Sequence, residues 1–255
     1  MILELIISFL SVNILLKFFT SLKYFKKKFF TFPNARSSHI KPTLTGGGFA
    51  FIIPSLVLSI VSLIKGDTFT LNFIVLLALP LSLIGLIDDI NGVAPLTRFF
   101  IQTSTVFSLI IFAQIHGYGF NSFDYGISYL ILIFMQVLFG IAAINFVNFM
   151  DGLDGLVISN FIVYFITLAI KIEPQLWPLI FALLAFLFWN WSPAKVFMGD
   201  VGSTFLGAVF VGILFLSSSF NQFISYTLVM TPLFADAFFC VIRRFLNNQN
   251  IFSAH

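Results

Sequence analysis

Cysteine, histidine and charged residues are scarce in this chain of 255 residues. It has one cysteine, Cys240, and three histidines, and Asp, Glu, Lys and Arg together make up 9% of it. A lone cysteine excludes a disulfide framework and a cysteine-based metal site. Hydrophobic residues reach 59%. An ordinary soluble domain is excluded, because it cannot hide that much apolar surface from water.

Long apolar runs take the place of charge, and the mean hydropathy is +1.06. Runs of about 18–20 apolar residues recur, each long enough to cross a hydrocarbon core of roughly 30 Å. They are continuously apolar and do not alternate, which argues against a transmembrane β-barrel. The first run lacks the basic start and cleavage site of a signal peptide, so we expect it to be retained. The sequence predicts an all-α, polytopic membrane helical bundle of about nine spans, at residues 2–20, 47–64, 70–87, 97–115, 127–145, 156–171, 177–191, 203–220 and 223–241.

The basic residues between these spans predict the orientation. Alternation places ten of them on the side of the 21–46 segment and two, Lys65 and Lys171, on the other, while Lys17 falls within the first span. Segments rich in Lys and Arg stay in the cytoplasm. We therefore predict that the 21–46 side is cytoplasmic and that the N-terminus lies outside.

Three acidic clusters interrupt the apolar sequence, all on the predicted cytoplasmic side. They are Asp88-Asp89, the segment from Asn148 to Gly155, and the segment from Phe197 to Ser203. A carboxylate at membrane depth costs roughly 2.5–3.5 kcal/mol on insertion scales. Because half of the ten acids occur in these clusters, they indicate a functional site.

Each cluster also has a plain structural interpretation. Adjacent carboxylates such as Asp88 and Asp89 point in different directions. One could bind metal or act as a base while the other orients it, or the pair could simply cap a helix. Residues spaced by three share a helix face, which applies to Asn145, Asn148, Asp151 and Asp154, although this series could also be a polar hinge.

The third cluster is a glycine-rich turn around Asp200. Gly199 and Gly202 permit unusual backbone geometry, and amides exposed in such a turn can receive an anion. Asp200 could also be an N-cap of the next span. Asn190 and Phe197 could contact a nucleotide by amide pairing and ring stacking, although each alone is more often a packing residue.

The 38–48 loop adds a cation to this side of the chain. It contains His39, Lys41 and the triplet Gly46-Gly47-Gly48. Lys41 could meet a phosphate as a point charge, whereas a lysine beside a membrane more often contacts anionic headgroups. Oxygen ligands, a cationic loop and the absence of a His/Cys cluster favour Mg²⁺ held by one or two protein oxygens and substrate phosphates.

At these residues the chain resembles the polyprenyl-phosphate N-acetylhexosamine-1-phosphate transferases, also called glycosyltransferase family 4. The motifs that carry the resemblance are Asn-Phe-Met-Asp-Gly-Leu-Asp-Gly at 148–155 and Phe-Met-Gly-Asp-Val-Gly-Ser at 197–203. The 37–48 loop looks most like the branch that initiates O-antigen. The resemblance implies Mg²⁺-dependent transfer of an N-acetylhexosamine-1-phosphate from a UDP-sugar to polyprenyl phosphate, with release of UMP, at the cytoplasmic face of the bacterial inner membrane.

The resemblance also implies roles for individual residues. Asp88, Asp89, Asp151 and Asp200 are the expected catalytic residues, and Asp88 is the one expected to activate the lipid phosphate. Asp200 with Asn148 would hold the metal. The expected substrate-binding residues are His39, Lys41, Asn145, Asp154, Asn190, Phe197 and His255.

The chain departs from the family pattern at two places. Thr45 stands where members of the branch commonly carry a basic residue. Sequences of the family also continue into a His-rich loop and further helices, and His255 matches the first His of that loop. We therefore expect one membrane transferase domain, 1–255, that lacks the rest of the loop and the last helices. Two alternatives stay open, an inactive truncated homologue and a membrane transporter, although a transporter would distribute its carboxylates across the membrane depth. We expect membrane lipids as surroundings and no nucleic-acid partner, and a homodimer stays open.

Overall fold

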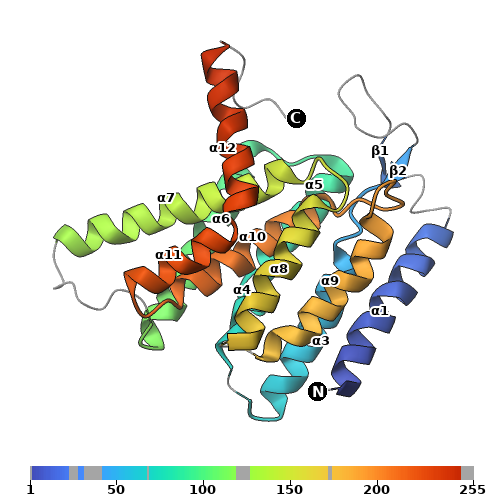
Figure 1. The fold of residues 1–255 in the computed structure, drawn as a ribbon, viewed down its shortest axis with the longest axis horizontal. Coiled ribbons are helices and arrows are strands. Elements are labelled where there is room, and N and C mark those ends of the chain that lie inside the picture. Colours follow the sequence, from blue (N-terminus) through green and yellow to red (C-terminus); the bar gives the residue numbers. More distant parts are fainter. Residues whose placement is uncertain are drawn as a thin grey trace.

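Helices make up almost all of the regular structure in this computed structural model (Figure 1). It describes residues 2–22, 28–31, 42–67, 69–118, 127–171 and 174–247. The elements are α1 (Ile2–Ser21), β1 (Phe30–Thr31), β2 (Thr43–Leu44), α3 (Phe49–Ile64), α4 (Thr70–Leu77), α5 (Leu79–Asn91), α6 (Pro95–Ile115), α7 (Ile127–Met150), α8 (Leu156–Lys171), the 3₁₀ turn η1 (Pro174–Leu176), α9 (Trp177–Asn190), α10 (Gly199–Phe215), α11 (Phe220–Val229) and α12 (Thr231–Leu246).

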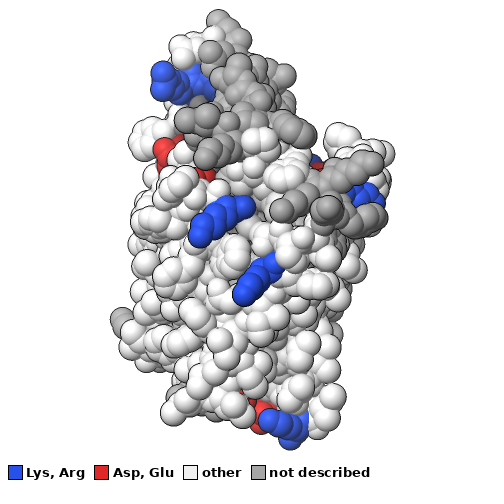
Figure 2. All heavy atoms as spheres, turned by 90° about the vertical axis from the view of Figure 1, so that its right-hand side faces the viewer, with Lys and Arg blue, Asp and Glu red and all other residues white. Residues whose placement is uncertain are grey.

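The chain is an integral membrane protein. Within the described residues, four helices are long and apolar enough to cross a membrane, at Ile2–Ser21, Thr70–Asn91, Pro95–Ile115 and Ile127–Met150. The third of the predicted spans therefore contains two consecutive helices, α4 and α5. Large apolar side chains are exposed on the outer surface, as expected where lipid is the solvent. Figure 2 shows a broad face with few charged side chains between its upper and lower ends.

The core is built around α10. Every residue of this helix from Val201 to Phe215 is buried, and its neighbours include α5, α6 and α7. A helix that is apolar all round belongs in the middle of a bundle. At Gly85 a Cβ atom would lie 2.6 Å from the carbonyl carbon of Asp200, so the glycine lets α5 approach the start of α10.

The last predicted span is wrong as a single helix. The structure divides 223–241 at Met230 into α11 and α12, and α12 projects from the top of the bundle in Figure 1. Pro232 explains the break, because a proline disfavours helical backbone at the preceding residue and fits only the first turn of a new helix. The count of nine spans and the external N-terminus stay predictions.

Candidate active site

A cavity of about 960 Å³ opens where α5 ends, α6 begins, α7 ends and α10 begins. These helix ends come from segments far apart in the sequence and bring the three acidic clusters together. The residues that line the cavity are Thr31, Thr45, Asp89, Pro95, Arg98, Phe99, Gln102, Asn145, Phe146, Asn148, Phe149, Asp151, Gly152, Phe197, Gly199 and Asp200.

Asp88 is held by the turn that follows it. Its Oδ1 accepts a hydrogen bond from the Val93 amide at 2.5 Å, and its Oδ2 accepts one from the Arg98 guanidinium at 2.6 Å. The side chain of Asp88 is 14% exposed. The helix break at Gly92 thus turns the chain back so that the first turn of α6 meets the last turn of α5.

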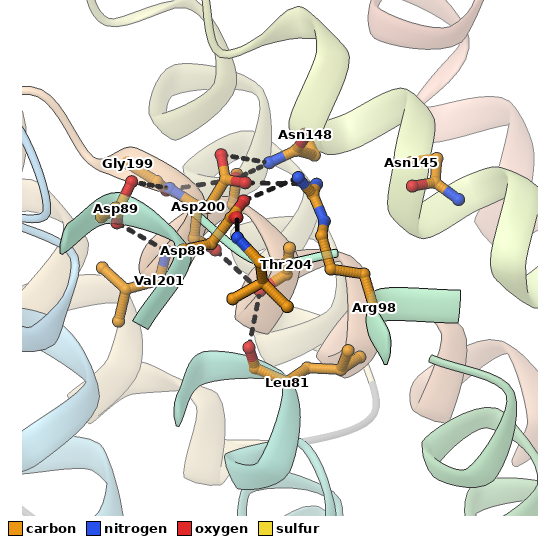
Figure 3. A network of polar contacts seen from close by, with 12 residues as sticks. Leu81, Asp88, Asp89, Arg98, Asn145, Asn148, Gly199, Asp200, Val201 and Thr204 are labelled. Atoms are coloured by element: carbon orange, nitrogen blue, oxygen red, sulfur yellow. Dashed lines mark hydrogen bonds and ion pairs between the residues drawn. The ribbon is translucent and has the colours of Figure 1, made fainter. Parts of the chain in front are cut away.

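Asp200 lies in the first turn of α10 and has two partners from other helices. The amide of Asn148 on α7 donates to its Oδ1 at 2.8 Å and to Ser203 at 2.9 Å. The second nitrogen of the Arg98 guanidinium lies 3.2 Å from its Oδ2. Figure 3 shows this network, in which α5, α6, α7 and α10 each contribute a side chain.

Asp89 has a different role from its neighbour in the sequence. Its two carboxylate oxygens accept hydrogen bonds from the backbone amides of Asp200 and Val201, at 3.0 and 3.1 Å. It therefore caps the N-terminus of α10 from another helix, where a negative charge is stabilising. The sequence predicted that these amides could receive an anion, and the anion in the structure is this carboxylate.

Gly199 makes the approach of Asp89 feasible. Its φ is +74°, and a Cβ atom there would lie 2.6 Å from Asp89 Oδ2 and 2.6 Å from the Gly46 nitrogen. An L-residue would be both strained in this conformation and too large. This confirms the prediction that Gly199 permits unusual backbone geometry.

The wall around Phe197 is built by pairing between two loops. Phe197 donates its amide to the Leu44 carbonyl at 2.7 Å and accepts from the Gly47 amide at 2.9 Å. Gly48 donates to the Met198 carbonyl at 2.9 Å. These backbone bonds hold the ring of Phe197 at the cavity and join the 43–48 segment to the start of α10.

Asp151 and Asp154 lie in the turn after α7 and not on the helix face that the spacing predicted, because α7 ends at Met150. Asp151 is half-buried and lines the cavity. Burial, and then the nearby charges of Asp200 and Asp89, raise the pKa of Asp151 well above its ordinary value, against a backbone hydrogen bond from Gly199. A cation in the cavity would relieve this repulsion.

Two other predicted binding residues support the loops instead of lining the cavity. Asp154 Oδ2 accepts from the Ala194 amide at 3.0 Å. Asn190 is 3% exposed, accepts from the Gly155 amide at 3.0 Å and donates to the Val196 carbonyl at 3.0 Å. Both residues hold the 151–155 turn against the segment that leads to Phe197.

Asn145 lines the cavity away from the carboxylates (Figure 3). It exchanges hydrogen bonds at 3.1 and 3.2 Å with Gln102, a residue that is 4% exposed. His39, Lys41 and His255 lie outside the described residues. The prediction of their roles stays a prediction.

Arg98 and Gln102 are polar residues that line the cavity and were not predicted as site residues. Arg98 was counted only among the basic residues that predict how the chain is oriented in the membrane. It follows Asp88 by ten residues, and the helix breaks at Gly92 and Pro95 between them allow the chain to turn back toward the acids. Gln102 lies one turn further along α6. The signal was a polar face at the start of an otherwise apolar span.

The donor set fits a hard divalent cation. No three Asp, Glu, His or Cys side chains in the described part of the chain form a ready-made metal cage. The Asp200 side chain is 29% exposed and offers carboxylate oxygen to the cavity, which Asp151 also lines. Mg²⁺ is commonly held in this way, by one or two carboxylates with the other positions left to water and phosphate.

A second, smaller cavity of about 290 Å³ lies at the opposite end of the bundle, beside the end of α3 and the start of α4. Three of its polar side chains bond to one another. Ser62 donates to Asp67 at 3.3 Å, and Asn72 donates to Ser62 at 3.1 Å. Among the described residues its lining has two carboxylates, Glu4 and Asp67, whereas the larger cavity has three, Asp89, Asp151 and Asp200. We therefore place the chemistry in the larger cavity.

Comparison with known proteins identifies the family of this chain. Residues 71–218 match glycosyl transferase family 4. A phospho-N-acetylmuramoyl-pentapeptide-transferase of Staphylococcus epidermidis is 34% identical over 220 residues, which cover 75% of this chain and 67% of that protein. One of Dictyoglomus thermophilum is 37% identical over 157 residues, which cover 53% of this chain and 49% of that protein. The matched segment contains α5, α6, α7 and the start of α10, and the chain belongs to glycosyl transferase family 4.

Proposed function

We propose that this protein is an enzyme that transfers an N-acetylhexosamine-1-phosphate from a UDP-sugar to polyprenyl phosphate and releases UMP. The observation that carries the proposal is the meeting of Asp89, Asp151, Asp200 and Arg98 at one cavity, with Asp88 bound to that arginine, in a member of this family. The relatives' name, phospho-N-acetylmuramoyl-pentapeptide-transferase, supports the same kind of group transfer.

The chemistry is a displacement at phosphorus. An oxygen of the lipid phosphate forms a bond to the phosphorus that carries the sugar, and the bond from that phosphorus to the bridging oxygen of the UDP-sugar breaks. UMP leaves with the bridging oxygen. Such reactions depend on positioning and on neutralising the charge of the transferring group.

The residues that line the cavity, together with Asp88 beside Arg98, divide this work. Asp200, oriented by Asn148, would hold Mg²⁺, which when bound neutralises the diphosphate. Asp88 would accept a proton from the lipid phosphate, and Asp151 would contact the donor. Asp89 would act through α10, by fixing the helix start that carries Asp200.

Direct attack and a covalent aspartyl-phosphate route both fit these residues. In the second route a carboxylate attacks first and the lipid phosphate then takes the sugar phosphate from it. Incubating the protein with a UDP-sugar labelled in the sugar-bearing phosphate, without lipid, separates the two. Acid-stable label on the protein supports the covalent route, and its absence with an active enzyme supports direct attack.

The identity of the UDP-sugar donor decides which glycan the reaction would serve. The 37–48 loop resembles the O-antigen-initiating branch, and we propose a UDP-N-acetylhexosamine as donor for a cell-envelope glycan. The relatives' name favours the competing donor, UDP-N-acetylmuramoyl-pentapeptide. Membranes that contain the protein and undecaprenyl phosphate, supplied with each labelled donor in turn, test this choice. Label in the lipid fraction from the hexosamine donors alone supports our proposal, and label from the muramoyl-pentapeptide donor alone contradicts it.

We further propose that the cavity faces the cytoplasm, where nucleotide sugars are made. A cysteine placed at exposed Asn91, after replacement of Cys240 by serine, should react with an impermeant thiol reagent only in inside-out vesicles. A cysteine at exposed Asp67, at the opposite end of the bundle, should react only in intact cells. The reverse pattern contradicts the orientation and the use of a nucleotide-sugar donor.

A further inference from the structure

Arg98 joins two of the acids that the proposed reaction needs. One guanidinium nitrogen lies 2.6 Å from Asp88 Oδ2 on α5, and the other lies 3.2 Å from Asp200 Oδ2 on α10 (Figure 3). It is the only Lys or Arg among the described residues that line the cavity. A planar guanidinium suits this bridge, because its donors have a fixed fork geometry.

The two halves of the bridge are unequal. The contact to Asp88 is short, and that carboxylate is 14% exposed and also held by the Val93 amide. The contact to Asp200 is longer, and that carboxylate is 29% exposed at the cavity. Charge-assisted bonds strengthen as they shorten and lose water. The guanidinium is therefore anchored at Asp88 and exchangeable at Asp200.

The exchangeable contact occupies the oxygen that suits a metal. A divalent cation on Asp200 and the second guanidinium nitrogen compete for the same carboxylate, and like charges at this distance repel. A guanidinium that stays on Asp88 can then direct its other nitrogen to a phosphate in the cavity. Arginine recognises phosphate well, since its donors match phosphate oxygens.

We propose that Arg98 is a positioning residue that neutralises Asp200 in the absence of metal, yields that carboxylate to a divalent cation and then contacts a substrate phosphate. The last step rests on the proposed function, whereas the competition with metal does not. Arg98 then has opposite effects on two measurable quantities. Its side chain weakens metal binding and strengthens substrate binding.

The test is a Mn²⁺ titration of the purified full-length protein in detergent, with free Mn²⁺ measured by electron paramagnetic resonance. Arg98→Gln should bind Mn²⁺ roughly two- to fivefold more tightly than the unaltered protein, the change expected for loss of a partly exposed ion pair. Arg98→Lys should lie between them. Arg243→Gln, at an exposed arginine of α12 outside the cavity, should leave the affinity unchanged.

Transfer assays on the same proteins complete the test. Arg98→Gln should raise KM for the UDP-sugar and lower kcat, although it binds Mn²⁺ more tightly. Weaker or unchanged Mn²⁺ binding in Arg98→Gln, with thermal unfolding like that of Arg98→Lys, overturns the competition. If the glutamine variant fails to fold, the lysine variant decides, and an affinity no tighter than that of the unaltered protein overturns the inference.

The two proposals fail in different ways. An unaltered protein that transfers no sugar phosphate from any donor, while Arg98→Gln still binds Mn²⁺ more tightly, contradicts the proposed function and keeps the competition. An active protein whose Mn²⁺ affinity does not respond to Arg98 contradicts the inference and keeps the function.

Discussion

The two ends of the bundle each hold a cavity, and their polar residues are arranged differently. At the smaller cavity, Ser62, Asp67 and Asn72 are within ten residues of one another and form a local hydrogen-bonded group. At the larger cavity, Asp89 reaches Val201 across 112 positions and Asn148 reaches Asp200 across 52. The smaller group closes a turn, whereas the larger one depends on the whole fold.

This contrast separates structural from chemical use of acids. A local group such as that of Asp67 can form whenever its turn forms. Carboxylates collected from remote segments lose water and repel one another: burial, and then the charges of Asp200 and Asp89, raise the pKa of Asp151. Such an arrangement costs stability and persists where function requires it. The substitutions below test whether the two ends differ in this way.

The largest effect is expected at Asp200. Asp200→Asn removes the carboxylate charge that would hold metal, and transfer should fall by roughly two to three orders of magnitude, as for the loss of one strong electrostatic contact in other enzymes. Asp67→Asn, at the other end, should keep most of the activity. The assay is label transfer to lipid at matched amounts of folded protein, and near-normal turnover in Asp200→Asn contradicts the metal assignment.

Gly199→Ala should come next. The positive φ alone costs about 1–2 kcal/mol for an L-residue, and the new methyl group would clash with Asp89 and the Gly46 nitrogen. We expect lower thermal stability and a large loss of transfer. Gly66→Ala is the matched control, because Gly66 has φ +89° with nothing within 4 Å of its added Cβ. Equal losses of stability and transfer in Gly199→Ala and Gly66→Ala would show that backbone strain alone, and not the clash with Asp89 and Gly46, causes the effect.

Asp89→Ala should have a moderate effect on stability. It removes the acceptor of two first-turn amides of α10, and loss of a helix N-cap typically costs about 0.5–2 kcal/mol. Asp89→Asn keeps one acceptor and should lose less. Thermal unfolding in detergent measures both, and equal stability of the alanine variant and the unaltered protein would show that Asp89 is not a cap.

The smallest effect is expected at Asp154. Asp154→Asn keeps an oxygen that can accept from the Ala194 amide, so the loss of stability should not exceed about 0.5–1.5 kcal/mol. Transfer should be far less affected than in Asp151→Asn, because Asp151 lines the cavity. A larger loss of turnover in Asp154→Asn would return Asp154 to the substrate-binding residues.

Apolar runs predicted most of the helices, since hydropathy is a local property that the bilayer enforces. The ends of the helices were predicted less accurately. The predicted span at 203 missed the first turn of α10, because Gly199-Asp200 has the composition of a turn and the carboxylate that caps this helix lies on α5. A tertiary cap leaves no mark in the neighbouring sequence.

The candidate site was predicted as a set of residues but not as a set of contacts. The acids stood out because charge is rare in this chain. Their division into Asp88 with Arg98, Asp89 on the α10 amides and Asp154 on the Ala194 amide depends on how helices approach one another. Arg98 was missed for the same reason, as a basic residue at a helix start is common at membrane surfaces.

The nucleotide product tests the central claim most directly. Proteoliposomes with the full chain, undecaprenyl phosphate, Mg²⁺ and the preferred UDP-sugar should release UMP in equal amount to the labelled lipid formed, and chelation of the metal should stop both. Asp200→Asn should release neither. Release of UDP would mean attack at the sugar carbon instead of phosphorus, and would contradict the account.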